Sequence, residues 1–378
     1  MKKFGLKLLS MGVLVAFLGV GYGVDTTYAA NDSTYIATEV VNDDIKNYAN
    51  ENFYNILNAT LTFEKNEENV ISNFELGEPF LLLDKDSNLE SYYFPVKNAG
   101  EIVYTYVLSK DENSNIFGQM SKFLAEELQK ISEENVTDVN NPITLFSEKG
   151  DIYYSLKNER TLIYESPGKT NSLTNDVTDE DITNFSENVI DIAENEDYSI
   201  PIMSRANVSS DANHVMIDFK ITETQGDQPW CAAYVAAAAL RNKKNPIGVS
   251  AYGMMKMTFP KLSDKQLFDT AISREQIKSF ANKNGSYPTI TNGPLSKGQV
   301  RQQLKNSSAV YAGGPGTGAY TGSRHAWDIY GWVTYGPGVE VYYAWNPWNS
   351  YPVTMDANSN TLNVPGGSFK WDVSMSGW

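Results

Sequence analysis

The only cysteine of the 378-residue chain, Cys231, lies where a thiol could act as a nucleophile. It begins the Ala-rich stretch 231–241, which contains neither Gly nor Pro and predicts a helix of about three turns. The unpaired N–H groups and positive dipole end of a helix N-terminus favour a thiolate, the form that attacks carbonyl carbon. Asp227 and Pro229 are expected to cap this helix and to occupy its first turn. The alternative interpretation is a small buried apolar residue, a common role for free cysteine.

A thiolate nucleophile needs a base, and the chain contains two histidines, His214 and His325. His325 precedes the predicted strand 326–333 and follows the Gly-rich run 312–318, where a substrate backbone could approach closely. His214 lies in a stretch with little pattern. We therefore expect His325 to be the base and His214 to be a surface residue.

A base in turn needs an orienting partner, which Asn346 supplies directly after the second predicted strand, 339–345. A turn at 335–338 would join the two strands into a hairpin and bring Asn346 to the ring N–H of His325. Trp348 would then cover the pair and exclude water. The alternatives are structural, because Asn-Pro forms turns in any context and a Trp-rich segment can simply be core.

Taken together, these residues resemble the papain-like cysteine peptidases. The segments Gln225-Gly226 and Trp230-Cys231-Ala232, with Trp345-Asn346-Pro347-Trp348, are most similar to the staphopain family of secreted bacterial peptidases. The resemblance extends from near Asp218 to Trp378.

The resemblance implies a role for each site residue. Cys231 would be the nucleophile, His325 the general base and then acid, and Asn346 the residue that orients the imidazole. Gln225 would donate to the oxyanion hole beside the backbone N–H of Cys231, and Trp348 would support the triad. Peptide bonds in protein or peptide substrates would be hydrolysed through a thioester acyl-enzyme, with no metal and no organic cofactor.

The resemblance also implies an α+β fold in two parts. A papain-like catalytic domain, with a helical layer and a strongly bent antiparallel β layer, would occupy 206–378. A smaller α+β propeptide domain at 31–205 would precede it and block the cleft until it is cut. Asp227, Trp327 and Asp328 depart from the family pattern, which bears on substrate specificity more than on catalysis.

Charge divides the chain at the same place. Residues 31–205 carry 12 basic and 34 acidic side chains, whereas 206–378 carry 15 basic and 11 acidic ones. The net charges are therefore −22 and +4, which makes nucleic acid an unsuitable partner for the acidic part and favours its long-range attraction to the basic part. The alternative is that the acidic charge serves only solubility. The poorly patterned segment 203–210 at the junction is expected to be accessible to proteases.

Residues 1–30 have a basic start, an apolar run at 8–20 and a small-residue exit. The run is too short to cross a hydrocarbon core of ~30 Å comfortably, so we interpret the segment as a secretory signal peptide. A buried core helix would need a polar stripe that the run lacks. The processed protein is expected to be extracellular and bacterial, without stable membrane association, and monomeric. An unpaired cysteine in an oxidising compartment favours a functional thiol.

The acidic part shows the patterns of a small α+β domain. Apolar spacing predicts two helices, at 43–61 and 117–131. Strands are expected at 79–83, 91–96, 102–108, 143–146, 152–156 and 162–164. The segment 84–88 starts like a calcium loop but lacks the required Gly and Glu, which indicates a plain acidic turn.

The predicted protein is thus a secreted papain-like endopeptidase made as an inactive precursor. Two other classes stay open. A cell-wall amidase using a Cys-His pair would usually carry wall-binding repeats, and none is visible. A non-catalytic adhesive protein on a papain-like scaffold would be expected to lack one of the four site residue types, and all four are present.

Overall fold

The computed structural model describes residues 33–64, 73–87, 89–110, 114–168, 176–185, 188–193, 213–335 and 339–378. All of the described residues belong to one compact unit, Ser33–Trp378. The expected signal peptide at 1–30 and the expected cleavage segment at 203–210 lie outside the described residues. Across the described ranges, no helix is both long enough and apolar enough to span a membrane.

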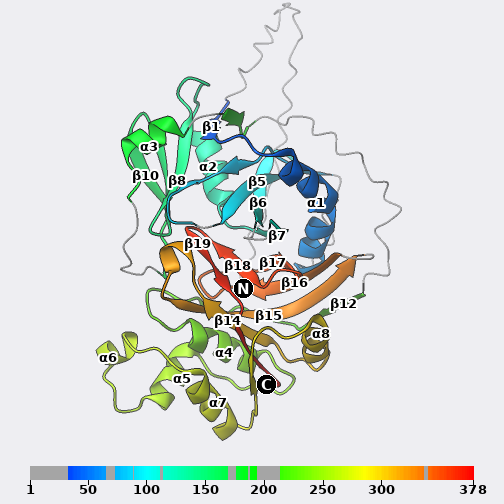
Figure 1. Ribbon diagram of the computed structural model, residues 1–378. Coiled ribbons are helices and arrows are strands. Elements are labelled where there is room, and N and C mark those ends of the chain that lie inside the picture. The colour runs from blue at the N-terminus through cyan, green and yellow to red at the C-terminus, as the bar shows by residue number, and fades with distance from the viewer. Residues whose placement is uncertain are drawn as a thin grey trace, which may run out of the picture. The chain divides into compact units, whose positions relative to one another are not determined.

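Helix α1 (Asp43–Phe63) confirms the helix predicted at 43–61. Its buried side chains include Ile45, Ala49 and Phe53, spaced four residues apart on one face. This face packs against β7 (Ile116–Ser121) of its own half and against β16 (Val339–Trp345) and β17 (Val353–Asp356) of the C-terminal half (Figure 1). The helix therefore packs across the junction between the two halves.

The N-terminal half also contains two shorter helices and a set of strands. The helices are α2 (Ala125–Glu134) and α3 (Asp179–Asn184). The strands are β1 (Tyr35–Thr38), β2 (Phe74–Leu76), β3 (Phe80–Leu81), β4 (Leu83–Asp84), β5 (Glu90–Asn98), β6 (Glu101–Lys110), β7 (Ile116–Ser121), β8 (Ile143–Glu148), β9 (Asp151–Leu156), β10 (Glu159–Tyr164) and β11 (Asn188–Asp191). Most predicted strands are confirmed, and the one predicted at 79–83 is divided between β3 and β4.

The helix predicted at 117–131 is wrong over its first eight residues, 117–124. Residues 117–121 belong to strand β7, and helix α2 begins only at Ala125, after Leu124 in the left-handed region. The apolar spacing from Phe117 onward fits a helix. Residues 117–121 form a strand instead, because β7 pairs with β6 on one side and with β17 on the other. This pairing satisfies the backbone hydrogen-bonding groups of β7 and buries the Met120 side chain completely.

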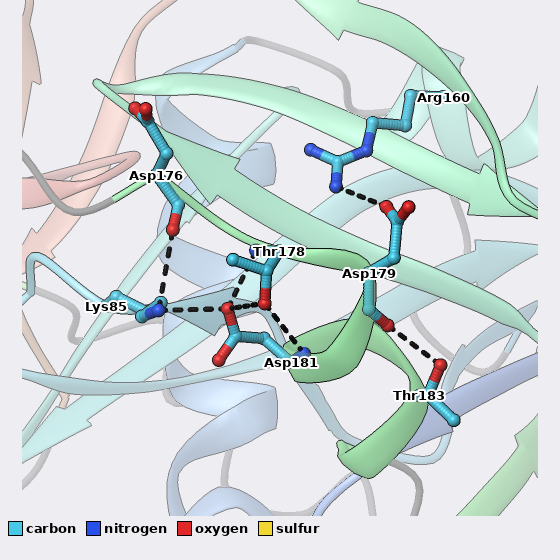
Figure 2. A network of polar contacts seen from close by, with 7 residues as sticks. All are labelled: Lys85, Arg160, Asp176, Thr178, Asp179, Asp181 and Thr183. Atoms are coloured by element: carbon cyan, nitrogen blue, oxygen red, sulfur yellow. Dashed lines mark hydrogen bonds and ion pairs between the residues drawn. The ribbon is translucent and has the colours of Figure 1, made fainter.

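Sheet A of the N-terminal half has the order β10-β9-β8-β1-β11, with β4 added beside β8. Helix α3 lies beside it and begins with a capping box between Thr178 and Asp181. Figure 2 shows how side chains from other segments reach this helix start. Lys85 Nζ lies 2.9 Å from Asp181 Oδ2, and Arg160 Nη2 lies 2.6 Å from Asp179 Oδ1. The start of α3 is therefore tied to the turn after β4 and to β10.

The C-terminal half begins with strand β12 (Asn213–Met216) and continues with five helices and a set of strands. The helices are α4 (Cys231–Arg241), α5 (Ala251–Thr258), α6 (Asp264–Phe268), α7 (Arg274–Lys283) and α8 (Lys297–Lys305). The strands are β13 (Thr289–Asn292), β14 (Val310–Pro315), β15 (Arg324–Tyr335), β16 (Val339–Trp345), β17 (Val353–Asp356), β18 (Thr361–Val364), β19 (Gly367–Lys370) and β20 (Val373–Ser376). A 3₁₀ turn at Gly318–Tyr320 lies between β14 and β15.

One antiparallel sheet runs through both halves. In the described residues it has twelve strands, with the path β13-β20-β14-β15-β16-β17-β7-β6-β5-β2 and with β12 and β3 beside it. The two halves meet where β17 pairs with β7, in the register Val353↔Ser121, Thr354↔Met120 and Met355↔Gln119. The N-terminal half therefore extends the sheet of the C-terminal half by edge-strand addition.

Helix α4 packs against strands β14 and β15, on the side of the sheet where α5 and α7 also gather (Figure 1). Ala233, Ala236 and Ala237 of α4 are fully buried in this contact region with Tyr311 and Ala326. Alanine favours the helix, and its small side chain allows the helix to approach the sheet closely. This packing confirms the helix predicted at 231–241 and sets its first residue beside the start of β15.

Candidate active site

Cys231 is the first residue of α4, and Trp230 before it fixes where the helix starts. The Trp230 indole is buried and its Nε1 donates to the carbonyls of Leu267 (3.2 Å) and Thr270 (3.0 Å). Trp230 is the N-cap residue and provides no side-chain cap. The expectations for Asp227 and Pro229 are therefore wrong, since the helix begins too late for Pro229 and the cap position belongs to Trp230.

The environment of the Cys231 thiol favours its neutral form. Its Sγ lies 3.9 Å from the carbonyl oxygen of Arg324, to which the thiol donates. Burial raises the pKa of Cys231 to about 11, and the backbone N–H groups of Ala326, Ala232 and Cys231 only partly offset that rise. The expectation that the helix start favours a thiolate is therefore not met in the whole chain, because desolvation outweighs the helix terminus.

His325 is the second residue of β15 and is almost completely buried. Its Nε2 lies 2.8 Å from Oδ1 of Asn346. An amide oxygen only accepts, so Nε2 carries the proton and Nδ1 is left as the acceptor nitrogen. Burial lowers the pKa of His325 to about 4 against the opposing effect of the bond to Asn346, which keeps the imidazole neutral at neutral pH.

Asn346 directly follows β16, whose register with β15 includes Asp328↔Trp345. This hairpin brings Asn346 to His325, which lies 21 residues earlier. The turn after β16 is fixed by two bonds: Trp348 N donates to Asn346 Oδ1 (3.1 Å), and Trp345 Nε1 donates to the Asn349 carbonyl (2.8 Å). The amide of Asn346 is therefore held in place from both sides.

Two aromatic rings pack on the imidazole. The ring centroid of His325 is 4.1 Å from Trp348 and 4.8 Å from Phe369 of β19. Trp348 was expected from the sequence. Phe369 was missed, because no local pattern connects it to a histidine that lies on a different strand. Together the two rings account for much of the burial that lowers the pKa of His325.

Gln225 lies in the same pocket, ahead of α4. Its Nε2 donates to the carbonyl of Gln228 (2.6 Å), and its backbone N–H donates to the carbonyl of Pro347 (2.7 Å). Nε2 has a second hydrogen, while its buried Oε1 has no partner among the described residues. The Gln225 side chain is thus fixed at the pocket, and the second hydrogen of its Nε2 is available for donation.

With the exception of Asn346, which lies behind His325 outside the lining, these site residues line one pocket of about 580 Å³. Cys231 and His325 face it from the helical layer and the β layer, and Gln225 and Trp348 also line it. The pocket also includes residues that sequence reasoning did not single out: Ala271, Ile272, Ser273, Arg274, Glu275, Tyr311, Ser323, Arg324 and Val373. His214, in contrast, is exposed on β12 and pairs with Val333, at the far end of β15 from His325.

The N-terminal half contributes to the same pocket through Pro167 and Gly168. Gly168 lies so close to the indole of Trp348 that a Cβ at this position would clash with the ring. Just before it, Ser166 is buried and its Oγ lies 2.8 Å from the hydroxyl of Tyr320. A short segment of the acidic half is therefore anchored beside His325 and its covering ring.

Asp328 lies on β15 beyond the pocket lining. It is fully buried, and neither carboxyl oxygen has a partner among the described residues. Burial raises its pKa well above the ordinary value, with Arg241 opposing the shift. A neutral carboxyl group is the form that this apolar surrounding favours.

The described residues offer little for metal binding, since no three His, Cys, Asp or Glu side chains within them are grouped closely enough to hold an ion. The described part of the acidic segment, 84–87, is a local turn, in which Asp84 Oδ1 accepts from the backbone N–H groups of Asp86 (2.9 Å) and Ser87 (3.0 Å). Such Asx-type bonds use the carboxylate within the chain.

Comparison with known proteins matches the two halves separately. Residues 209–378 match the family described as staphopain peptidase C47, and residues 33–193 match the staphopain proregion. The chain is 25% identical over 363 residues to a protein of Staphylococcus epidermidis named extracellular cysteine protease, covering 91% of this chain and 88% of that protein. It is 24% identical over 368 residues to staphopain A of Staphylococcus aureus, covering 92% of each.

Proposed function

This chain belongs to the staphopain family of cysteine peptidases, which carry a proregion, and on that premise we propose that Cys231, His325, Asn346 and Gln225 are its catalytic machinery. The observation that carries the proposal is the 2.8 Å contact between His325 Nε2 and Asn346 Oδ1, because His325 lines the same pocket as Cys231. This contact leaves Nδ1 as the nitrogen that can take a proton from the thiol.

Peptide hydrolysis then proceeds in two steps. The Cys231 thiol passes its proton to Nδ1 of His325 as Sγ adds to the substrate carbonyl carbon. His325 returns the proton to the leaving amine, the C–N bond breaks, and a thioester remains on Cys231. In the second step His325 removes a proton from water, which attacks the thioester and releases the acid and the thiol.

The negative oxygen of each tetrahedral intermediate needs donors. The backbone N–H of Cys231, at the start of α4, is one donor because a helix start leaves such groups unpaired. Gln225 Nε2 is the other, through the hydrogen that is not given to Gln228. Preorganised donors of this kind are worth roughly 2.7 to 4 kcal/mol each in the transition state.

Asn346 and Trp348 act on His325 rather than on substrate. Asn346 holds the tautomer and the ring orientation through its bond to Nε2. Trp348, with its ring centroid 4.1 Å away, covers the bond between the two and shields it from water. We assign both residues to positioning roles.

We further propose that residues 31–205 are a propeptide that inhibits the catalytic domain at 206–378. Pro167 and Gly168 occupy the pocket wall beside Trp348, and strand β7 extends the sheet at β17. Gln119 Nε2 also donates to the carbonyl of Asn363 (3.0 Å). These contacts support an inhibitor held by the sheet and by the cleft at once.

The neutral state of the site supports the same proposal. Burial raises the pKa of Cys231 and lowers that of His325, so a thiolate–imidazolium pair is disfavoured in the whole chain. Removing Pro167 and Gly168 from the pocket would admit water and reduce both shifts. Cutting the chain between the halves would thereby activate the site as well as open it.

The place of action is proposed to be outside a bacterial cell. The signal-peptide pattern at 1–30 supports this, as does the name of the Staphylococcus epidermidis relative, extracellular cysteine protease. We further propose that the chain acts as a monomer on protein or peptide substrates.

Casein hydrolysis by the full-length precursor, activated by limited proteolysis, tests the proposal. Cys231→Ala and His325→Ala should each abolish hydrolysis, whereas His214→Ala, which removes the other histidine, should retain it. Full activity of Cys231→Ala, or loss of activity in His214→Ala, would contradict the assignment.

A further inference from the structure

One end of the cleft pocket is lined by groups that the proposed hydrolysis does not use. Residues 271–275, at the start of helix α7, line the pocket together with Cys231. The helix has ten residues, and its N-cap Ser273 accepts a hydrogen bond from the N–H of Gln276. The positive end of the helix dipole therefore lies at this end of the pocket.

Arg274, the first residue of α7, brings an uncompensated positive charge to the pocket. It is partly buried and makes neither an ion pair nor a side-chain hydrogen bond with any of the described residues. Arg324, the other arginine of the lining, is paired with Asp372. The two guanidinium groups therefore differ, and only Arg274 is available to an anion.

Tyr311 of β14 forms the floor near these charges and is only 4% exposed. A Cβ on Gly313 would lie 3.1 Å from its Cε1 and 3.4 Å from its hydroxyl oxygen, so the ring extends along the strand over that glycine. Gly313 itself lines the pocket. Within the described ranges the hydroxyl has no hydrogen-bond partner, so this almost completely buried side chain brings an unused donor to the pocket.

This end of the pocket has hydrogen-bond donors on one side and apolar side chains on another. Burial is the main cause that raises the pKa of Tyr311, with the nearby Cys231 adding to it, so the hydroxyl stays protonated and able to donate. Ile272 and Val373 are buried apolar residues of the lining that would pack against alkyl carbons. The site therefore offers two donors at the end of an apolar wall.

The carboxyl groups near this end do not cancel the arginine. Asp227 and Glu275 of the lining are exposed, where water and salt screen their charges. Asp372 is engaged by Arg324, and Asp328, opposite Tyr311 in the strand register, is fully buried with its pKa well above the usual range.

We propose that the α7 end of the pocket is a subsite for an acidic substrate side chain, selected by the guanidinium of Arg274 and the hydroxyl of Tyr311. A glutamate side chain supplies both parts of the match, methylene carbons for Ile272 and Val373 and a carboxylate for the two donors. A lysine at the same substrate position would meet Arg274 and be rejected. This subsite rests on the proposed function, because the substrate chain must pass Cys231.

The test uses fluorogenic octapeptides in which Glu, Gln, Leu or Lys is placed in turn at each position flanking the scissile bond. The enzyme is the full-length precursor activated by limited proteolysis. At one position kcat/KM should be about tenfold higher for Glu than for Lys, the size expected for one charge-assisted hydrogen bond. Added salt should reduce this ratio, because Arg274 is only partly buried.

Variants identify the groups that select the side chain. Arg274→Glu should reverse the preference toward Lys at that position alone, and Tyr311→Phe should reduce the ratio of Glu to Gln. Lys278→Glu is the matched control, since it makes the same charge change on the same helix outside the pocket lining. Casein turnover by each variant reports that it is folded. No preference for Glu over Lys at any position, or a preference that Arg274→Glu leaves unchanged, would overturn the subsite.

Binding to a cut but inactive enzyme separates the subsite from the reaction. The same peptides, labelled for fluorescence anisotropy, are titrated onto proteolytically processed Cys231→Ala. Tighter binding of Glu peptides than of Lys peptides here supports the subsite even if the hydrolysis proposal were to fail. Equal binding of the two contradicts the subsite while leaving the hydrolysis proposal intact.

Discussion

Gly168 of the acidic half lies directly against the indole of Trp348, with no space for a Cβ between them. Trp348 in turn packs on the imidazole of His325 at a ring distance of 4.1 Å. A larger side chain at position 168 would therefore collide with the Trp348 ring, which covers the candidate base His325.

This contact predicts that Gly168→Val makes the precursor leaky. The added side chain must displace either the indole or the inhibitory segment, and overpacking of this kind costs about 1–3 kcal/mol. We expect the uncut variant to hydrolyse a small peptide substrate roughly five- to 150-fold faster than the uncut wild type. Gly248→Val is the control, because a Cβ at Gly248 meets nothing within 4 Å. Equal hydrolysis rates of the uncut Gly168→Val variant and the uncut wild type would contradict an inhibitory role of this contact.

The thiol of the uncut chain should react slowly with alkylating reagents. With a pKa of about 11, Cys231 is almost entirely protonated at pH 7, and only the thiolate reacts. The alkylation rate, followed by intact mass, should keep rising up to about pH 11 and should increase at pH 7 once the chain is cut. A rate that levels off below pH 8 in the uncut chain would show that burial does not control this thiol.

His325 should make the folded chain less stable in weak acid. Its folded pKa of about 4 lies below the ordinary value of 6.5, so the unfolded chain binds more protons between these pH values. The stabilisation is complete above pH 6.5 and is lost as pH falls toward 4, by roughly 3 kcal/mol in total. The measurement is urea denaturation of Cys231→Ala, with and without His325→Gln, at pH 7 and pH 4. The variant should lose less stability between the two, and identical losses would contradict the shift.

Asn346→Ala should impair the reaction without abolishing it. The substitution removes one oriented hydrogen bond to the imidazole, an effect of about 1.5–3 kcal/mol, or roughly 10- to 150-fold in kcat. KM should change little, because Asn346 positions His325 and does not touch substrate. Asn349→Ala is a suitable control, since only its backbone carbonyl takes part in the neighbouring bond to Trp345. A loss as large as that of His325→Ala would mean that Asn346 does more than orient the ring.

Local patterns in the sequence were sufficient to predict the elements that carry the candidate site. The Ala-rich run predicted α4 with Cys231 at its start, because alanine spacing and the absence of Gly and Pro act within a few turns. His325 and Asn346 meet because they lie near the same end of two antiparallel strands, β15 and β16, so the pairing of two strands that follow each other in the chain determines their proximity. The opposite net charges of the two halves and the single cysteine of the chain likewise follow from the sequence alone.

Tertiary structure decided what depends on distant partners. Residues 117–121 have helical apolar spacing and still form β7, because the ladder to β17 joins residues far apart in the chain. Phe369 and Gly168 reach His325 and Trp348 from other segments, and no local periodicity records such contacts. The protonation of Cys231 and His325 follows from the burial that these contacts create. Residue types and short-range spacing thus specify which groups are available for chemistry, whereas their environment exists only once the halves have packed, since desolvation is a property of the assembled core.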